Sequence, residues 1–67
     1  MGYRIPLDIE ILVAMEPGKP YRAEHVRDAI GGNIVQAMGL SRLLHKLYKR
    51  GLMEKTRDSR GVLYIRK

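Results

Sequence analysis

Between residues 34 and 50, polar and basic side chains recur at the spacing of one helix face. They are Gln36 and Arg42 in the first half and Lys46, Lys49 and Arg50 in the second. A glutamine amide can bond an adenine edge through two hydrogen bonds, and a guanidinium can do the same with guanine, whereas lysines more often meet phosphates. The chemistry that this stretch predicts is recognition of a nucleic acid.

Side chains that commonly perform catalysis are scarce in this sequence. There is no cysteine, and the two histidines, His25 and His45, fall on different predicted helices without a nearby pair of carboxylates. Ser41 and Ser59 lack a base and an orienting group for nucleophilic attack. The glycine pair at 31–32 lies between helices rather than after a strand, which is not the place of a phosphate-binding loop. We therefore expect no enzyme activity, no metal site and no cofactor.

The positive charge is concentrated in the second half of the chain. The 67 residues carry 13 Lys and Arg against seven Asp and Glu, a net charge of +6 at pH 7. Residues 1–33 have a net charge of −1, so residues 34–67 carry +7. This asymmetry favours a cationic binding surface over evenly spread solubilising charge. The longest apolar run, residues 11–15, is far shorter than the roughly 20 residues of a membrane-spanning helix, and we expect no membrane partner.

Three helices must position these side chains. Apolar residues three and four apart, after a proline that suits a first helical turn, predict a helix over residues 6–16. A second helix is predicted over residues 23–30 and a third over residues 34–50, ending at Gly51. The link between them would be Gly31-Gly32-Asn33, with Asn33 as the N-cap of the third helix. A three-residue, glycine-rich link is typical of a helix-turn-helix.

Gly39 lies inside the third predicted helix, where glycine costs about 1 kcal/mol relative to alanine. One interpretation is a local break at residues 38–40 that separates two shorter helices. The other is that Gly39, on the basic face, lets the helix backbone approach another surface closely.

A β-hairpin is predicted over residues 52–66. Two extended runs, 52–56 and 62–66, alternate polar with β-branched or aromatic side chains. The polar turn between them, residues 57–61, would carry two arginines at its tip. A further short extended segment is predicted at Tyr21-Arg22, and Tyr48 and Tyr64 are expected to be core or half-buried residues.

Two segments are similar to parts of a known family. The run LHKLYKRGLMEK at residues 44–55 resembles a recognition-helix end followed by a first wing strand, and RGVLYI at residues 60–65 resembles the returning strand. The chain thus resembles the winged helix-turn-helix superfamily, particularly its small bacterial and archaeal regulators, over residues 6–67. The resemblance implies an α+β fold, mainly α, with three helices and a C-terminal hairpin wing in one domain, residues 1–67.

One string departs from the arrangement common in that family. Many members have a Gly-Leu-Ser turn directly before the recognition helix, and Gly39-Leu40-Ser41-Arg42 matches that turn. It lies only nine residues before Gly51, however, which would leave a short recognition helix. We therefore prefer residues 34–50 as the recognition helix and residues 31–33 as the turn.

The resemblance and the charge together predict contacts with double-stranded DNA. The third helix would enter the major groove, and the wing, residues 55–62, would meet the minor groove or the backbone. The residues expected to make these contacts are Asn33, Val35, Gln36, Gly39, Arg42, Lys46, Lys49, Arg50, Lys55, Arg57 and Arg60.

Simpler roles remain open for several of these side chains. Gln36 could be only an exposed polar residue. Lys49 and Arg50 could serve only to complement the dipole at the end of the helix. Arg57 and Arg60 could pair with Asp58 within the turn.

The function expected from the sequence is that of a sequence-specific transcriptional regulator in the cytoplasm of a prokaryotic, archaeal or virus-infected cell. The alternatives are a protein-interaction winged helix with an acidic partner, and a non-specific DNA or RNA binder. No small-molecule ligand is indicated. Because the core of so short a chain is small and the N-terminal region, with Ile9 and Val13, is more apolar than one buried face requires, we expect a homodimer through that region.

Overall fold

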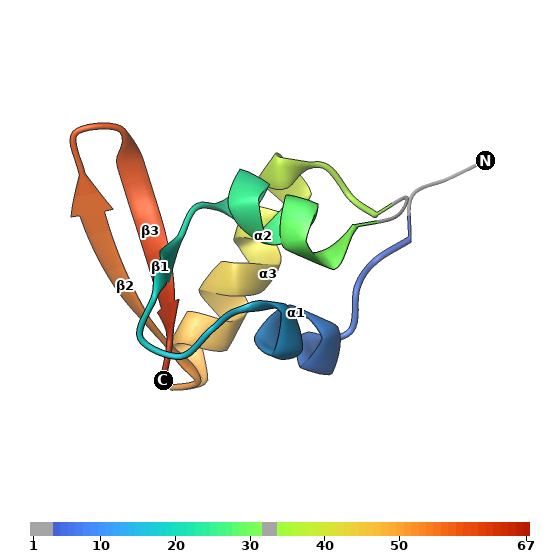
Figure 1. The fold of residues 1–67 in the computed structure, drawn as a ribbon, viewed down its shortest axis with the longest axis horizontal. Helices are drawn as coiled ribbons and strands as arrows, with labels where there is room; N and C mark the ends of the chain where they lie inside the picture. The colour runs from blue at the N-terminus through green and yellow to red at the C-terminus, as the bar shows by residue number, and fades with distance from the viewer. Residues whose placement is uncertain (1–3, 32–33) are drawn as a thin grey trace.

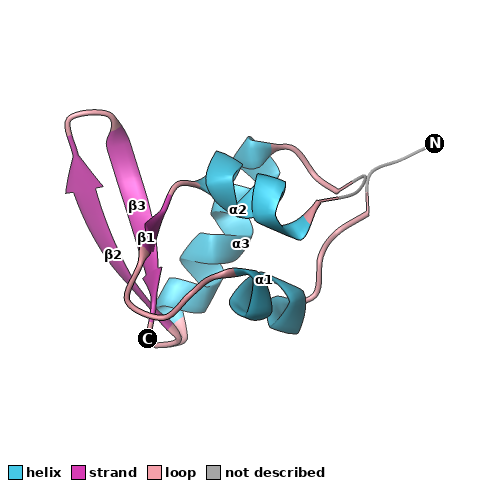
Figure 2. Cartoon of the chain, viewed as in Figure 1, coloured by secondary structure: helices cyan, strands magenta, loops and turns pink. Residues whose placement is uncertain are grey.

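The chain folds as an α+β structure of helices packed beside a small sheet. In the computed structural model, residues 4–31 and 34–67 are described. The elements in chain order are α1 (Asp8–Ala14), β1 (Pro20–Tyr21), α2 (Ala23–Ile30), α3 (Ala37–Lys49), β2 (Met53–Asp58) and β3 (Gly61–Arg66). The strands form one antiparallel sheet in the order β1-β3-β2. Figures 1 and 2 show the β2–β3 hairpin at one end of the molecule, with its turn extending away from the helices.

The hydrophobic core lies where the three helices meet the sheet, and every element contributes to it. Its buried members are Ile11, Met15, Tyr21, Val26, Leu40, Leu44, Leu47, Met53 and Tyr64. The sequence spaces the three leucines of α3, Leu40, Leu44 and Leu47, at four and three residues, which fits one face of a helix, and all three lie on its buried side. This packing fixes which side of α3 remains in solvent.

The hairpin is confirmed, but its turn is shorter than predicted. Strand pairing continues to Asp58↔Gly61, so only Ser59 and Arg60 form the turn. Arg57, predicted in the turn, lies within β2 opposite Val62. The turn closes early because the Asp58 carboxylate accepts the backbone N–H groups of Arg60 and Gly61, at 2.8 and 3.1 Å.

The first strand and the first helix also differ from the predicted bounds. The extended pair is Pro20–Tyr21, not Tyr21-Arg22, because these residues face Ile65 and Tyr64 of β3. Helix α1 covers residues 8–14 rather than 6–16. It begins after Leu7, whose N–H bonds the Glu10 carboxylate at 3.1 Å. It ends early because buried Met15 is extended and its carbonyl accepts a hydrogen bond from the Arg66 guanidinium at 3.2 Å.

Helix α3 begins at Ala37, three residues later than predicted. Ile34 is fully buried and forms a parallel bridge with Arg4, and the Val35 N–H donates to the Arg4 carbonyl at 3.0 Å. The Arg27 guanidinium donates to the Val35 carbonyl at 3.1 Å. These contacts hold residues 34–35 in an extended form, so the helix N-cap is Gln36 and the predicted three-residue link is wrong. Asn33, predicted as that cap, lies outside the described residues.

Within α3 the backbone is continuous through Gly39, as the prediction of a single third helix required, and the alternative interpretation of a break at residues 38–40 is wrong. The helix therefore contains no turn at Gly39-Leu40-Ser41-Arg42. Gly51, with φ +82°, follows the helix in the left-handed conformation that glycine adopts at low cost, as predicted. The outcome is a single uninterrupted helix of 13 residues that presents one long face.

Candidate nucleic-acid interface

The exposed face of α3 carries a line of cations. Arg42, Lys46 and Lys49 are all exposed and follow one another at spacings of four and three residues, so they share the side opposite the buried leucines. Met38 lies one turn before Arg42 on the same side and is 76% exposed. The face thus combines a planar guanidinium, two ammonium groups and one apolar side chain.

The hairpin extends this cationic surface beyond the helix. Lys55 and Arg57 project from the same face of β2, because side chains two residues apart in a strand point to the same side. The Lys55 ammonium lies 5.6 Å from the centre of the Tyr48 ring, a cation–π contact that links β2 to the end of α3. Arg60 lies in the turn and is exposed.

A shallow groove lies between the end of α3 and β2. Three lysines and one carboxylate line it, together with an aromatic ring, a glycine and a buried methionine: Tyr48, Lys49, Gly51, Met53, Glu54, Lys55 and Lys67. Of the two tyrosines predicted as core or half-buried, Tyr64 is in the core, whereas Tyr48 is 40% exposed and is not part of it. The Tyr48 ring packs beside His45 with ring centres 5.9 Å apart. Lys67 was not predicted as a member of the interface because only the tertiary fold brings it to Lys49 and Lys55. Tyr48 was not predicted there because its contact with Lys55 forms only when β2 packs beside the end of α3.

The ion pairs of the described residues leave these cations free. Three salt bridges form, Arg4–Glu10 at 2.5 Å, Arg50–Asp8 at 2.6 Å, and Arg22–Asp58. None of them uses the six cations predicted at 42, 46, 49, 55, 57 and 60. These six charges are therefore available to an anionic ligand without first breaking an internal ion pair. We name them, as one set, the cationic surface.

Arg50 does not belong to the cationic surface, although the sequence predicted it as a contact residue. Its guanidinium turns toward α1 and pairs with Asp8, which lies 42 positions away along the chain. The simpler expectation for Arg50, that it only complements the dipole at the end of the helix, omits this ion pair as well.

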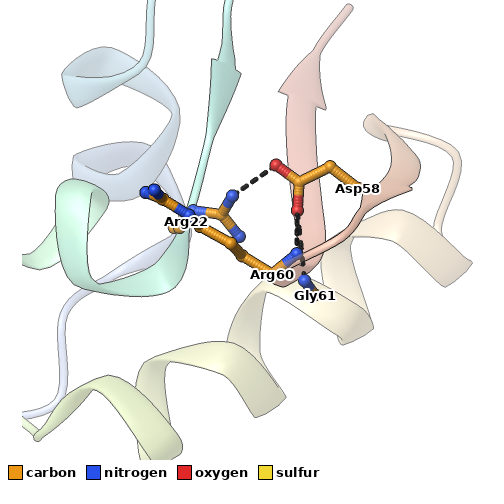
Figure 3. Close-up of polar contacts among 4 residues, drawn as sticks. All are labelled: Arg22, Asp58, Arg60 and Gly61. Atoms are coloured by element: carbon orange, nitrogen blue, oxygen red, sulfur yellow. Dashed lines mark hydrogen bonds and ion pairs between the residues drawn. The ribbon is translucent and has the colours of Figure 1, made fainter.

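Asp58 holds the hairpin in place rather than pairing with its neighbouring arginines. One carboxylate oxygen accepts the Arg60 and Gly61 N–H groups, and the other meets the guanidinium of Arg22, the residue before α2 (Figure 3). The Arg60 N–H, followed by the Arg22 guanidinium, lowers the pKa of Asp58 below its usual value, against an opposing effect of burial. The side chains of Arg57 and Arg60 remain outside the three salt bridges.

The residues before α3 are placed differently from the prediction. Val35 is half-buried and packs against the core, so its side chain does not point outward as expected. Gln36 is exposed at the helix start and lines a hollow with Glu24, Arg27, Asp28 and Ala37. The surroundings of Gln36 thus hold two carboxylates and Arg27, whose guanidinium is bonded to the Val35 carbonyl, unlike the line of free cations further along the helix.

Gly39 lies against Val35 within the same chain. A β-carbon at Gly39 would come within 3.3 Å of the Val35 β-carbon, tighter than an ordinary contact. Gly39 is also half-buried. Close packing against Val35 is thus one explanation for a glycine at this position. The predicted close approach to an external surface is a second explanation.

Among residues 4–31 and 34–67, no three His, Asp or Glu side chains gather as a metal-ligand set. No helix of the described part is long and apolar enough to cross a membrane. Comparison with protein families, with curated proteins and with solved structures found no match to this chain.

Proposed function

We propose that this chain is a sequence-specific binding protein for double-stranded DNA and acts as a transcriptional regulator. The observation that carries the proposal is the cationic surface, six cations on one exposed helix face and the adjoining hairpin with no internal ion pairs among the described residues. An α-helix fits the major groove, and neutralisation of phosphates supplies most of the affinity of such proteins.

In this proposal the fold acts as a winged helix. Helix α3 lies in the major groove, with Arg42 near base edges, where it can bond guanine through two hydrogen bonds. Met38, one turn earlier, can contact a thymine methyl group. Lys46 and Lys49 lie further along the same face and meet phosphates.

The β2–β3 hairpin acts as the wing. Lys55, Arg57 and Arg60 reach the backbone or the adjacent minor groove. Its two ties to the helices, Asp58 to Arg22 and Lys55 to Tyr48, support a wing held at a fixed angle to α3. A rigid wing loses less conformational entropy on binding. Regulation of transcription places the protein where cellular DNA is, in the cytoplasm of a prokaryotic, archaeal or virus-infected cell.

The test is a selection of bound sequences from random duplexes, followed by titration of the selected duplex and an unrelated one at several salt concentrations. We expect the logarithm of affinity to fall linearly with the logarithm of salt, with a slope of about −4.5 if five cations meet phosphates. We also expect a preference for the selected duplex of about 10³-fold or more. Equal affinity for both duplexes would instead indicate a non-specific binder, and no binding, or no dependence on salt, would contradict the proposal.

A further inference from the structure

Four large apolar side chains lie exposed in and before α1. Ile9 and Val13 are 62% and 71% exposed and lie one helical turn apart. They occupy the side of α1 opposite the fully buried Ile11 and Met15. Ile5 and Leu7, each 65% exposed, precede the helix. So many exposed aliphatic side chains within nine residues are characteristic of an interaction surface.

A shallow groove lies beside this apolar ridge, between α1 and α2. It is lined by Glu10, Val13, Ala14, Ala29 and Ile30. The two alanines leave room for a side chain of another helix to enter, as in ridges-into-grooves packing. The ridge at Ile9 and Val13 and the groove are thus neighbours on one face of the molecule.

The two carboxylates of α1 that flank the ridge, Asp8 and Glu10, are both paired within the chain. Glu10 pairs with Arg4 at 2.5 Å, and Asp8 pairs with Arg50 at 2.6 Å. A partner that brings a net charge would gain nothing from these pairs. When a second copy presents the same face, Asp8 and Glu10 of both copies remain paired with their own arginines. These four carboxylates therefore do not repel one another across the contact.

We propose that two copies of this chain associate through the α1 face about a two-fold axis, with the Ile9–Val13 ridge of each copy in the α1–α2 groove of the other. An isologous contact requires one patch that is complementary to itself, and a ridge next to a groove satisfies that requirement. The core separates this face from the exposed side of α3, so pairing leaves both cationic surfaces outward. The proposal does not depend on DNA binding.

The test is the mass of the protein in solution without DNA, measured by sedimentation over a wide range of concentration. The wild-type chain is expected to pass from one chain to two. Val13→Glu, which places a charge on the ridge, is expected to weaken association by about tenfold or more. Ala29→Gln, which fills the groove and leaves the ridge unchanged, is expected to act in the same direction.

Met38→Glu is the matched control, because Met38 is exposed to a similar extent (76%) but lies on α3. It should leave the mass unchanged, and circular dichroism checks that all variants keep the helices. A wild-type mass of one chain up to millimolar concentration, growth beyond two chains, or loss of the dimer in Met38→Glu with retention in Val13→Glu would each overturn the proposal. None of these outcomes bears on the DNA titrations, so the two proposals fail separately.

Discussion

The carboxylate of Asp58, at the end of β2, pairs with the guanidinium of Arg22, 36 positions earlier in the chain. The same carboxylate accepts the backbone N–H groups of Arg60 in the turn and of Gly61 after it, so one side chain both closes the hairpin and ties it to the start of α2. Figure 3 shows both sets of contacts converging on Asp58. Two of these contacts join the hairpin turn to itself and one joins the hairpin to α2, and all three are made by the charged form of this group.

Acid is expected to loosen the hairpin through Asp58. The pKa of Asp58 is lowered in the fold, chiefly by the Arg60 N–H, so its contribution to stability is present above its unfolded pKa of about 3.9. That contribution is lost as the pH falls through the lower, folded value. The measurement is the thermal midpoint between neutral pH and pH ~2.5 for wild type and Asp58→Asn. The variant should be less stable at neutral pH, and the difference should shrink at low pH. An equal deficit at every pH would contradict this role.

Arg42 and Lys46 are expected to affect DNA binding in different ways. Arg42→Ala removes a side chain proposed to bond a base, so it should cost about 1–3 kcal/mol and relax preference at one position of the site. Lys46→Gln removes a phosphate contact, so it should weaken all duplexes alike and reduce the salt slope by about 1.

Lys19→Gln is the control for Lys46→Gln, because it makes the same charge change away from the cationic surface. Lys19 precedes β1, and its ammonium lies 5.5 Å from the centre of the Tyr21 ring. Titrations against the selected and the unrelated duplex separate these effects. A salt slope reduced as much by Lys19→Gln as by Lys46→Gln would show that net charge, not the proposed surface, determines binding.

Local sequence was sufficient to predict most of the fold. The bounds of α2 were predicted as observed, because a Gly-containing link follows an amphipathic run, and the leucine stripe of α3 identified its buried side. The start of α3 was wrong because it depends on Arg4 and Arg27, which hold residues 34–35 extended from distant positions. The sequence of residues 34–50 alone does not indicate these contacts, because both partners lie outside it.

In the candidate site, too, local features were predicted correctly and features that depend on distant contacts were not. Six cations that the sequence singled out are exposed and outside the ion pairs, because charge and helical spacing are local properties. Arg50 was misplaced because its partner, Asp8, lies on another helix. Lys67 was missed because its approach to Lys49 and Lys55 follows from the return of β3 beside β2.

Leu44 is expected to be essential for the fold. It is fully buried in α3, and truncation of a buried leucine to alanine costs about 2–5 kcal/mol. A chain of this length rarely has more than about 3–5 kcal/mol of stability from its core, so Leu44→Ala should be largely unfolded at 25 °C. Urea unfolding followed by circular dichroism measures this. Leu52→Ala, at a residue 37% exposed, is the control and should unfold near the wild-type midpoint. If Leu44→Ala unfolded at the same urea concentration as the wild-type protein, Leu44 would not belong to the core.

Gly39 and Val35 are expected to be energetically coupled. Alanine in a helix interior is favoured over glycine by about 1 kcal/mol, but a β-carbon at Gly39 would meet the Val35 β-carbon at 3.3 Å. Gly39→Ala alone should therefore gain less than the full helix propensity. Val35→Ala keeps the β-carbon of residue 35 but removes its two methyl groups, which pack against the core. Residue 35 can then move away from a β-carbon at position 39. In that background Gly39→Ala should gain more, and the coupling is measured by urea unfolding of the four proteins in a double-mutant cycle. Strictly additive effects would mean that Val35 does not explain the glycine. The close approach of α3 to an external surface would then be its remaining explanation, and the effect of Gly39→Ala on affinity for the selected duplex would test it.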